Sequence, residues 1–167
     1  DDYLKYYDKK SKSKGGSRRA FALKGKKLPL ASIGVIHVNI NLEQLKTKAK
    51  EKNVTITQYL TAVIIHSIYN SNYQKYNGIK PIKVCIPVDL KKYFKSETVS
   101  NFFSYIIVKA NMDLKMLQSF DGILKFVKQE FERLLTKEEI SRTMSANVKP
   151  GNNVFIKSIP LFFKLAI

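Results

Sequence analysis

The sequence predicts an α/β fold, in which a mixed sheet has helices packed around it. Stretches with the two-residue period of a strand and stretches with the 3.6-residue period of a helix both occur in the chain. In addition, 44% of the 167 residues are hydrophobic, which is enough to bury one sizeable core. We expect one lobe of a larger protein, because the apolar residues 154–167 should be covered by something beyond the chain end.

Three stretches predict the strands of the sheet. Residues 32–40 are rich in β-branched side chains and alternate, with one face fully apolar. Residues 82–88 alternate as a second strand. Residues 102–108 are apolar on both faces, which predicts a strand inside a sheet that is covered on both sides. A helical turn is expected over residues 90–94, between the second and third strands.

Two capped helices are expected between the first and second strands. Asn41 should cap a short helix that ends near Asn53. Thr55 and Gln58 have the spacing of a capping box, in which each side chain bonds the backbone N–H of the other residue. This box predicts the start of a buried helix over residues 56–70, which has little polar surface.

Two more helices should follow the third strand. Apolar side chains recur at three- and four-residue spacing over residues 114–135, which predicts the longest amphipathic helix of the chain. Thr136 and Glu139 have the capping spacing again, so another helix should start there. It should run through Ala146 and be broken at Pro150.

The chain is expected to divide into residues 1–29, a linker and lobe entry, and residues 30–167, the truncated lobe itself. Residues 11–17 have the Ser- and Gly-rich composition of a flexible linker. An aromatic patch precedes them at Tyr3, Tyr6 and Tyr7.

The formal net charge of +17 would attract nucleic acid, anionic lipid or a phosphorylated ligand. Only four of the 30 basic residues are arginines, however, and the lysines are spread along the whole chain. Base readout and bidentate phosphate binding favour arginine, so we do not expect nucleic acid as a partner. A basic module that binds an anionic polymer or a membrane surface without catalysis remains the alternative function, and its binding should weaken steeply with salt.

None of the residues that most often carry chemistry has a partner at a useful spacing. His37 and His66 have no nucleophile or orienting carboxylate nearby, so both are interpreted as structural. Cys85 is the only cysteine, which excludes an intrachain disulfide and a thiolate metal cage, and we expect it to pack as a small hydrophobe. Glu138 and Glu139 lie at a helix start, where carboxylates favour the helix dipole.

The sequence contains no phosphate loop, no dinucleotide-binding turn and no zinc-protease motif. No stretch approaches the roughly 18 uninterrupted apolar residues of a membrane-spanning helix, and no signal peptide opens the chain. With a single cysteine, the expected location is the cytoplasm.

Two segments carry a resemblance to a known family. Residues 87–94 (PVDLKKYF) and 100–103 (SNFF) resemble the PV-[ND]-LR-x-[FY]-F … N-F-F segment of bacterial alcohol-acetyltransferase-like proteins, which belong to the chloramphenicol-acetyltransferase and condensation-domain superfamily. Residues 54–62 (VTITQYLTA) resemble the VT-[IL]-x-[DE]-[YV]-L-x-A helix start of the second lobe of that family. The compatible region runs from about residue 30 to the C-terminus.

The resemblance implies a two-lobed chloramphenicol-acetyltransferase-like fold with an active site in a tunnel between the lobes. In the family a catalytic histidine in an HHxxxDG motif ends the first lobe, and this sequence contains no such motif. The chain therefore resembles the second, C-terminal lobe of a CoA-dependent O-acyltransferase, inactive without the preceding N-terminal lobe as its partner. Acyl-CoA would be a co-substrate rather than a tightly bound cofactor, and the acceptor would be a small alcohol.

By the same resemblance, the candidate tunnel-lining and acceptor-binding residues are Asn101, Phe102, Phe103 and Ser104, with Asp89 nearby. No catalytic residue and no metal ligand is expected in this lobe. Other interpretations stay open for two of these residues. Asn101 would serve structure alone if its side chain bonds the backbone at a strand start, and Asp89 if it only fixes its loop.

Two residues depart from the family pattern. Lys91 stands where the pattern has arginine, which would remove a bidentate contact if the family makes one there. Lys95 stands where proline commonly follows the phenylalanine. Both departures weaken the transfer of site residues to this loop.

Overall fold

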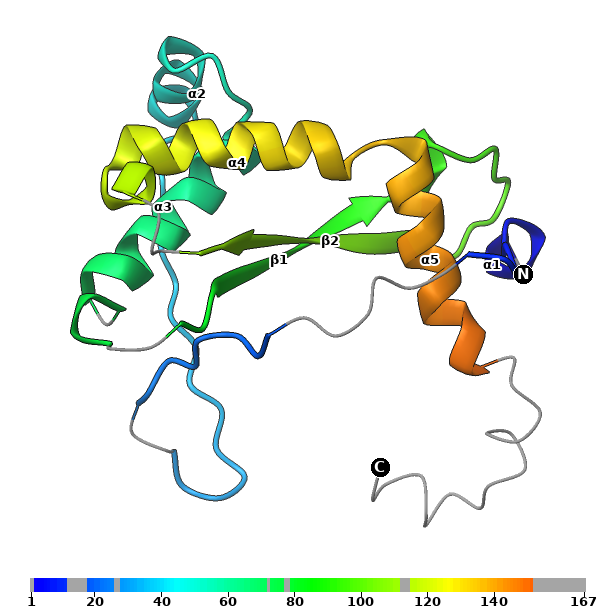
Figure 1. Cartoon of the computed structure of the whole chain (residues 1–167), viewed down its shortest axis with the longest axis horizontal. Helices are drawn as coiled ribbons and strands as arrows, with labels where there is room; N and C mark the ends of the chain where they lie inside the picture. Colours follow the sequence, from blue (N-terminus) through cyan, green and yellow to red (C-terminus); the bar gives the residue numbers. More distant parts are fainter. Residues whose placement is uncertain are drawn as a thin grey trace. The chain divides into compact units, whose positions relative to one another are not determined.

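The computed structural model describes residues 2–11, 18–25, 28–71, 73–76, 79–111 and 115–151. Helices and a two-stranded antiparallel sheet occur together in them, which confirms the mixed α/β class (Figure 1). The larger mixed sheet expected from the sequence is not found in this part of the chain. The elements are α1 (Asp2–Lys5), α2 (Leu42–Glu51), α3 (Ile56–Ser71), η1 (Tyr73–Lys75), β1 (Ile82–Asp89), η2 (Leu90–Lys92), β2 (Phe103–Ala110), η3 (Lys115–Gln118), α4 (Phe120–Leu134) and α5 (Lys137–Gly151).

The chain divides into two compact units. The first unit contains Asp1–Ser17, Cys85–Ile107 and Glu132–Ile167. The second contains Arg18–Val84 and Val108–Phe131. The first unit therefore includes α1, most of β1 and β2, and α5, together with every residue named above as a candidate for acceptor binding.

The capping chemistry predicted for the second unit is confirmed. The Asn41 Oδ1 atom accepts a hydrogen bond from the backbone N–H of Gln44 at 3.0 Å, and α2 begins there. In the capping box before α3, the Thr55 N–H donates to Gln58 Oε1 at 2.8 Å, and the Gln58 N–H donates to Thr55 Oγ1 at 3.2 Å. Both helix starts are therefore fixed by side chains within three residues of the N-cap.

Buried aliphatic side chains form the core of the second unit, and an exposed ion pair joins the end of α2 to α4. Ile65 of α3 and Val127 of α4 are fully buried. The ammonium group of Lys52, which follows α2, lies 2.7 Å from a carboxylate oxygen of Asp121 in α4. This hydrogen bond and the charge of Asp121 raise the pKa of Lys52 above its ordinary value.

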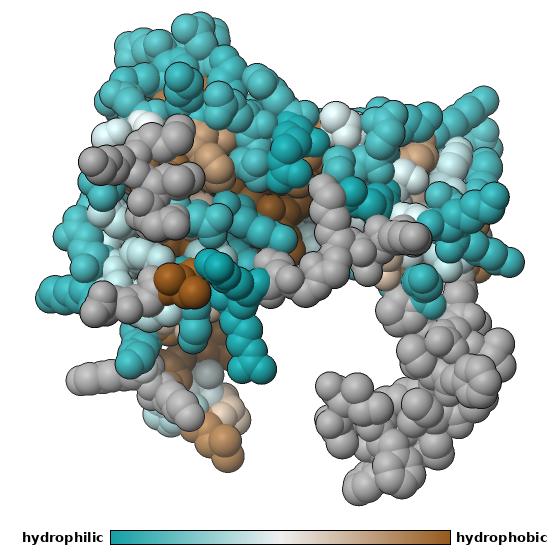
Figure 2. Space-filling model, viewed as in Figure 1, coloured by the Kyte–Doolittle hydropathy of each residue, from teal (hydrophilic) through white to brown (hydrophobic). Residues whose placement is uncertain are grey.

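The strand predicted over residues 32–40 is wrong. The structure shows these residues without helix or strand, and all of them are exposed. Ile33 and Ile36, for example, are 89% and 90% exposed. His37 lies in the same exposed segment and not in a strand. The segment is part of the light-blue loop of Figure 1, and hydrophobic surface protrudes at that place in Figure 2.

An aromatic cluster forms part of the core of the first unit. The Phe102 ring is 3% exposed and contacts Tyr3, Tyr6 and Phe94 at centroid distances of 4.9, 6.4 and 6.3 Å. Helix α1 also packs on α5. The aromatic patch at the start of the chain is thus packed against a buried phenylalanine of the loop that leads into β2.

Three further expectations for the first unit need correction. Strand β2 pairs only with β1 among the described residues, so it is not an interior strand. Its side chains alternate between buried and more exposed positions instead of being buried on both faces. Cys85 is exposed and does not pack as a small hydrophobe. Helix α5 continues to Gly151, past Pro150 where a break was expected, and the apolar residues 154–167 fall outside the described part.

Candidate functional site

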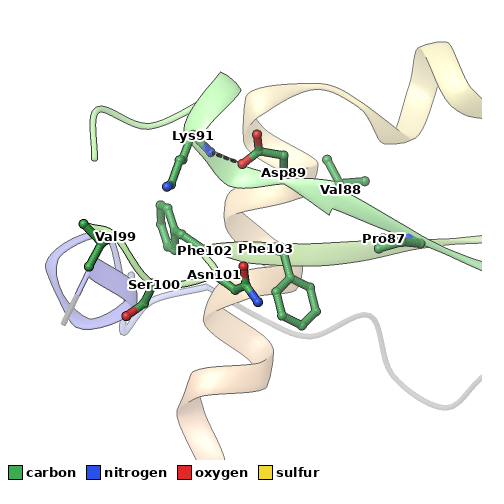
Figure 3. A pocket seen from close by; sticks show the side chains of 9 residues that line it. All are labelled: Pro87, Val88, Asp89, Lys91, Val99, Ser100, Asn101, Phe102 and Phe103. Atoms are coloured by element: carbon green, nitrogen blue, oxygen red, sulfur yellow. Dashed lines mark hydrogen bonds between the residues drawn. The ribbon is translucent and has the colours of Figure 1, made fainter. Parts of the chain in front are cut away.

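The candidate site is a cavity of about 380 Å³ beside the end of β1 and the start of β2 in the first unit (Figure 3). We call it the Asn101 cavity. Four of the five residues singled out from the sequence, Asp89, Asn101, Phe102 and Phe103, line it. The fifth, Ser104, lines a neighbouring cavity. The other residues that line the Asn101 cavity are Pro87, Val88, Lys91, Val99 and Ser100.

The Asp89 carboxylate fixes the turn that follows β1. Its Oδ1 atom accepts a hydrogen bond from the backbone N–H of Lys91 at 3.0 Å, which caps η2, the turn predicted over residues 90–94 (Figure 3). Carboxylates are favoured at such a position because they bond an otherwise unpaired N–H group. Asp89 therefore has a structural task at the rim of the cavity.

The Lys91 side chain holds the loop on the other side of the cavity. Its ammonium group donates to the backbone carbonyl oxygen of Thr98 at 2.9 Å. A single carbonyl acceptor needs one N–H donor, so lysine suffices where the family pattern has arginine. The loop is tied once more at Lys95, whose carbonyl oxygen accepts a hydrogen bond from the Tyr6 hydroxyl.

Asn101 contributes an exposed amide side chain to the lining. It is exposed, and no hydrogen bond of its side chain to another described residue is found. The backbone bond considered from the sequence is thus not made within this part of the chain. An amide has two donor hydrogens and an acceptor oxygen, so Asn101 can both donate to and accept from a ligand.

Phe102 and Phe103 lie in opposite environments although they are adjacent. Phe102 is 3% exposed and belongs to the aromatic cluster, whereas Phe103 is 53% exposed. Neighbouring residues of an extended chain point to opposite faces, which separates their roles. Phe103 offers apolar surface to a ligand, and Phe102 anchors the wall behind it.

Tyr3 was missed as a site residue by the sequence reasoning. Its hydroxyl group donates to the Phe103 carbonyl oxygen at 2.9 Å and accepts from the Phe103 N–H at 3.0 Å. Because the two residues are 100 positions apart, no local pattern links them. The only signal was the aromatic patch itself, which a flexible linker would not need.

The lining residues contain no histidine, and the two histidines of the chain belong to the second unit. His66 packs edge-on against Phe120 at 5.5 Å and lies within hydrogen-bond distance of Asn70, as a structural histidine does. Within the described residues there is no group of three or more His, Cys, Asp or Glu side chains that would hold a metal ion. The polar side chains that line the Asn101 cavity are the Asp89 carboxylate, the Lys91 ammonium group, the Ser100 hydroxyl and the Asn101 amide.

No helix in the described part of the chain is both long and apolar enough to cross a membrane.

The family model described as alcohol acetyltransferase matches residues 9–154. This match covers the Asn101 cavity completely. Comparisons with curated proteins and with solved structures gave no match.

Proposed function

The chain belongs to the alcohol acetyltransferase family, and we propose that it supplies the acceptor-binding surface of a CoA-dependent O-acyltransferase. The carrying observation is the Asn101 side chain, which is exposed beside the apolar ring of Phe103 in one cavity and has no bond to another described residue. An alcohol has a hydroxyl group that an amide can bond and a hydrocarbon part that a phenyl ring can contact.

The walls of the cavity support a positioning role. Asp89 fixes the turn after β1 through a bond of 3.0 Å, and Lys91 fixes the loop that leads to Asn101 through a bond of 2.9 Å. Phe102 anchors the chain next to Asn101, because its ring is buried among other aromatic rings. These contacts hold the backbone segment that carries Asn101, so this segment loses little entropy when a ligand is bound.

We place the chemical step at the boundary with a preceding lobe, as in a two-lobed chloramphenicol-acetyltransferase-like fold. A histidine of that lobe would take the proton from the alcohol hydroxyl as general base. The alcohol oxygen then attacks the thioester carbonyl of acyl-CoA and the C–S bond breaks as the ester forms. The histidine returns the proton to the sulfur, so CoA leaves as the thiol. In this scheme the residues of this chain bind and orient the acceptor.

The test compares the 167-residue chain with a protein in which the preceding lobe is joined to it. Thiol release from acetyl-CoA is followed in the presence of a series of small alcohols. We expect no turnover above background for the chain alone and clear turnover for the joined protein. Turnover by the chain alone would contradict the assignment of the general base to the other lobe.

An inactive joined protein that is folded and binds acetyl-CoA would overturn the proposed function itself. A second readout separates acetyl transfer from thioester hydrolysis, because the acetyl ester of the added alcohol is identified by mass. Ester formation that requires both lobes is the result that we expect.

A further inference from the structure

A loop of the second unit carries large apolar side chains in solvent. We call residues 28–38 the apolar loop, and every one of them is exposed. Figure 2 shows hydrophobic surface that protrudes where Figure 1 draws this loop in light blue. A contiguous apolar patch on a folded protein marks an interaction site. The large aliphatic side chains of the loop are Leu28, Leu30, Ile33, Val35, Ile36 and Val38.

The apolar loop is folded back on itself at a turn. The Ser32 N–H donates to the Pro29 carbonyl oxygen at 3.1 Å, which closes a four-residue turn around Leu30. A Cβ atom on Gly34 would lie 3.2 Å from the Leu28 side chain, so Leu28 packs against Gly34. Leu30 itself is 101% exposed. The turn therefore presents an aliphatic side chain that is as exposed as in an extended peptide.

Both ends of the apolar loop are attached to the folded part of the second unit. Before the loop, the Phe21 N–H donates to the Pro81 carbonyl oxygen at 2.8 Å. The Phe21 ring also contacts Tyr73 and Tyr76, at a centroid distance of 5.1 Å in each case. After the loop, Asn41 caps α2. The loop can therefore enter another environment while the unit that carries it stays folded.

Two lysines lie beside the attachment of the loop at Phe21. Lys24 and Lys75 line one hollow of about 180 Å³, together with Phe21, Ala22 and Tyr76. No ion pair of either ammonium group with another described residue is found. An anionic group in this hollow would be bound by two positive charges.

The sequence around the apolar loop contains basic residues without acidic ones. From Lys9 to Leu42 there are nine Lys or Arg residues and no Asp or Glu. A nucleic acid would match this charge but leave the aliphatic side chains in water. A second copy of the chain would cover them, but it would bring another net charge of +17 against the first. A membrane with anionic headgroups matches both features, because hydrocarbon lies beneath the charged surface.

We propose that the apolar loop inserts into one leaflet of a membrane that contains anionic phospholipid, where Lys24 and Lys75 bind a headgroup phosphate. Insertion takes the aliphatic side chains out of water, and the lysines add attraction to the anionic surface. A single weak anchor gives only marginal membrane binding, so stable binding needs both features. The inference does not rest on acyl transfer.

The experiment mixes the 167-residue chain with vesicles and measures the bound fraction by flotation. The vesicles contain phosphatidylcholine alone or an equal mixture of phosphatidylcholine and phosphatidylglycerol. The mixed vesicles should be bound at least about tenfold more tightly, and added salt should weaken this binding.

Val35→Asp should lower the affinity for the mixed vesicles at least about tenfold, because it removes an inserted side chain and adds a repelled charge. Val99→Asp is the matched control, since it makes the same change at an exposed residue outside the loop. It should change the affinity little. Both side chains are exposed, so both variants should stay folded.

The lysines are tested as a pair. Lys24→Gln combined with Lys75→Gln should lower the affinity about tenfold or more, because each lysine near an anionic surface strengthens binding about fivefold. Lys48→Gln combined with Lys50→Gln removes the same charge from α2, which Figure 1 draws at the other end of the second unit from the light-blue loop. This second pair should lower the affinity clearly less.

Insertion itself is measured with Leu30→Trp, since the chain contains no tryptophan of its own. With mixed vesicles, the fluorescence of this variant should shift to shorter wavelength and be quenched by brominated acyl chains. Val99→Trp should show neither change.

Equal affinities of Val35→Asp and Val99→Asp, or a Leu30→Trp signal that bromine does not quench, would overturn the insertion of the loop. Equal binding to both kinds of vesicle would overturn the role of anionic lipid. Self-association that Val35→Asp abolishes, without vesicle binding, would assign the loop to a second copy of the chain instead. Acetyl-CoA takes no part in these measurements, so their outcome is independent of the acetyl-transfer assay.

Discussion

The hydroxyl group of Tyr3 bonds both backbone polar groups of Phe103, at 2.9 Å to the carbonyl oxygen and 3.0 Å to the N–H. The Leu90 N–H donates to the carbonyl oxygen of Phe102, so the backbone carbonyl group of Phe102 points toward the end of β1. Backbone groups of successive strand residues point to opposite edges, and Phe103 therefore faces the other edge of β2. At this position Tyr3 takes the place of a neighbouring strand and covers an edge that would otherwise need a partner.

Tyr3→Phe should destabilise the chain by about 1 to 2 kcal/mol, because it removes two hydrogen bonds and keeps the ring. Urea unfolding followed by circular dichroism measures the change. Tyr7→Phe is the matched control, since no hydrogen bond of the Tyr7 hydroxyl is found among the described residues. Equal stability of the two variants would show that the Tyr3 bonds contribute nothing.

Asp89→Ala should cost about 1 kcal/mol, because it leaves the Lys91 N–H at the start of η2 without its cap. Asp89→Ser should lose less, since a serine hydroxyl can accept the same bond. Thermal unfolding of the two variants provides the comparison. If alanine and serine gave the same loss, the carboxylate would act through its charge and not through the cap.

Phe102→Ala should destabilise the chain by about 3 to 5 kcal/mol, because it removes a buried ring that contacts Tyr3, Tyr6 and Phe94. Phe103→Ala should cost less than about 1 kcal/mol, since this side chain is 53% exposed. Urea unfolding of the two variants measures both losses, as shifts of the unfolding midpoint at an unchanged slope. A reversed order would mean that the two rings exchange their environments in solution.

The amide hydrogens of residues 33–40 should exchange with solvent almost as fast as those of an unstructured peptide. The segment is exposed and forms no helix or strand in the structure, so little protects its backbone. Hydrogen exchange read by mass spectrometry on peptides from this region measures the rate. Slow exchange would contradict the structure and favour the strand predicted from the sequence.

The helix starts were predictable because their chemistry is local. Asn41 and Thr55 each bond a backbone N–H three residues along the chain, and such spacing is visible in the sequence. The strand over residues 32–40 failed for the opposite reason. Alternation shows that a segment suits a sheet, but a strand also needs a partner edge, and none of the described strands pairs with it. Cys85 was misplaced because its face of β1 is open instead of covered.

The candidate site was partly predictable for the same reason. Asp89, Asn101, Phe102 and Phe103 lie in two short motifs at either end of one loop, and the loop brings both motifs to one cavity. The contribution of Tyr3 depends on a contact across 100 residues, which no sequence pattern encodes. The separation of Ser104 into a second cavity depends on the packing of α5 and was equally hidden.

The central claim is that Asn101 binds the acetyl acceptor, and the most direct test is the kcat/KM for the alcohol in the joined two-lobed protein. Asn101→Ala should lower this value roughly tenfold, as expected when a hydrogen bond to the acceptor is lost. Asn111→Ala makes the same change at an exposed residue outside the cavity and should leave it unchanged. Equal values for both variants and the unaltered protein would contradict the account.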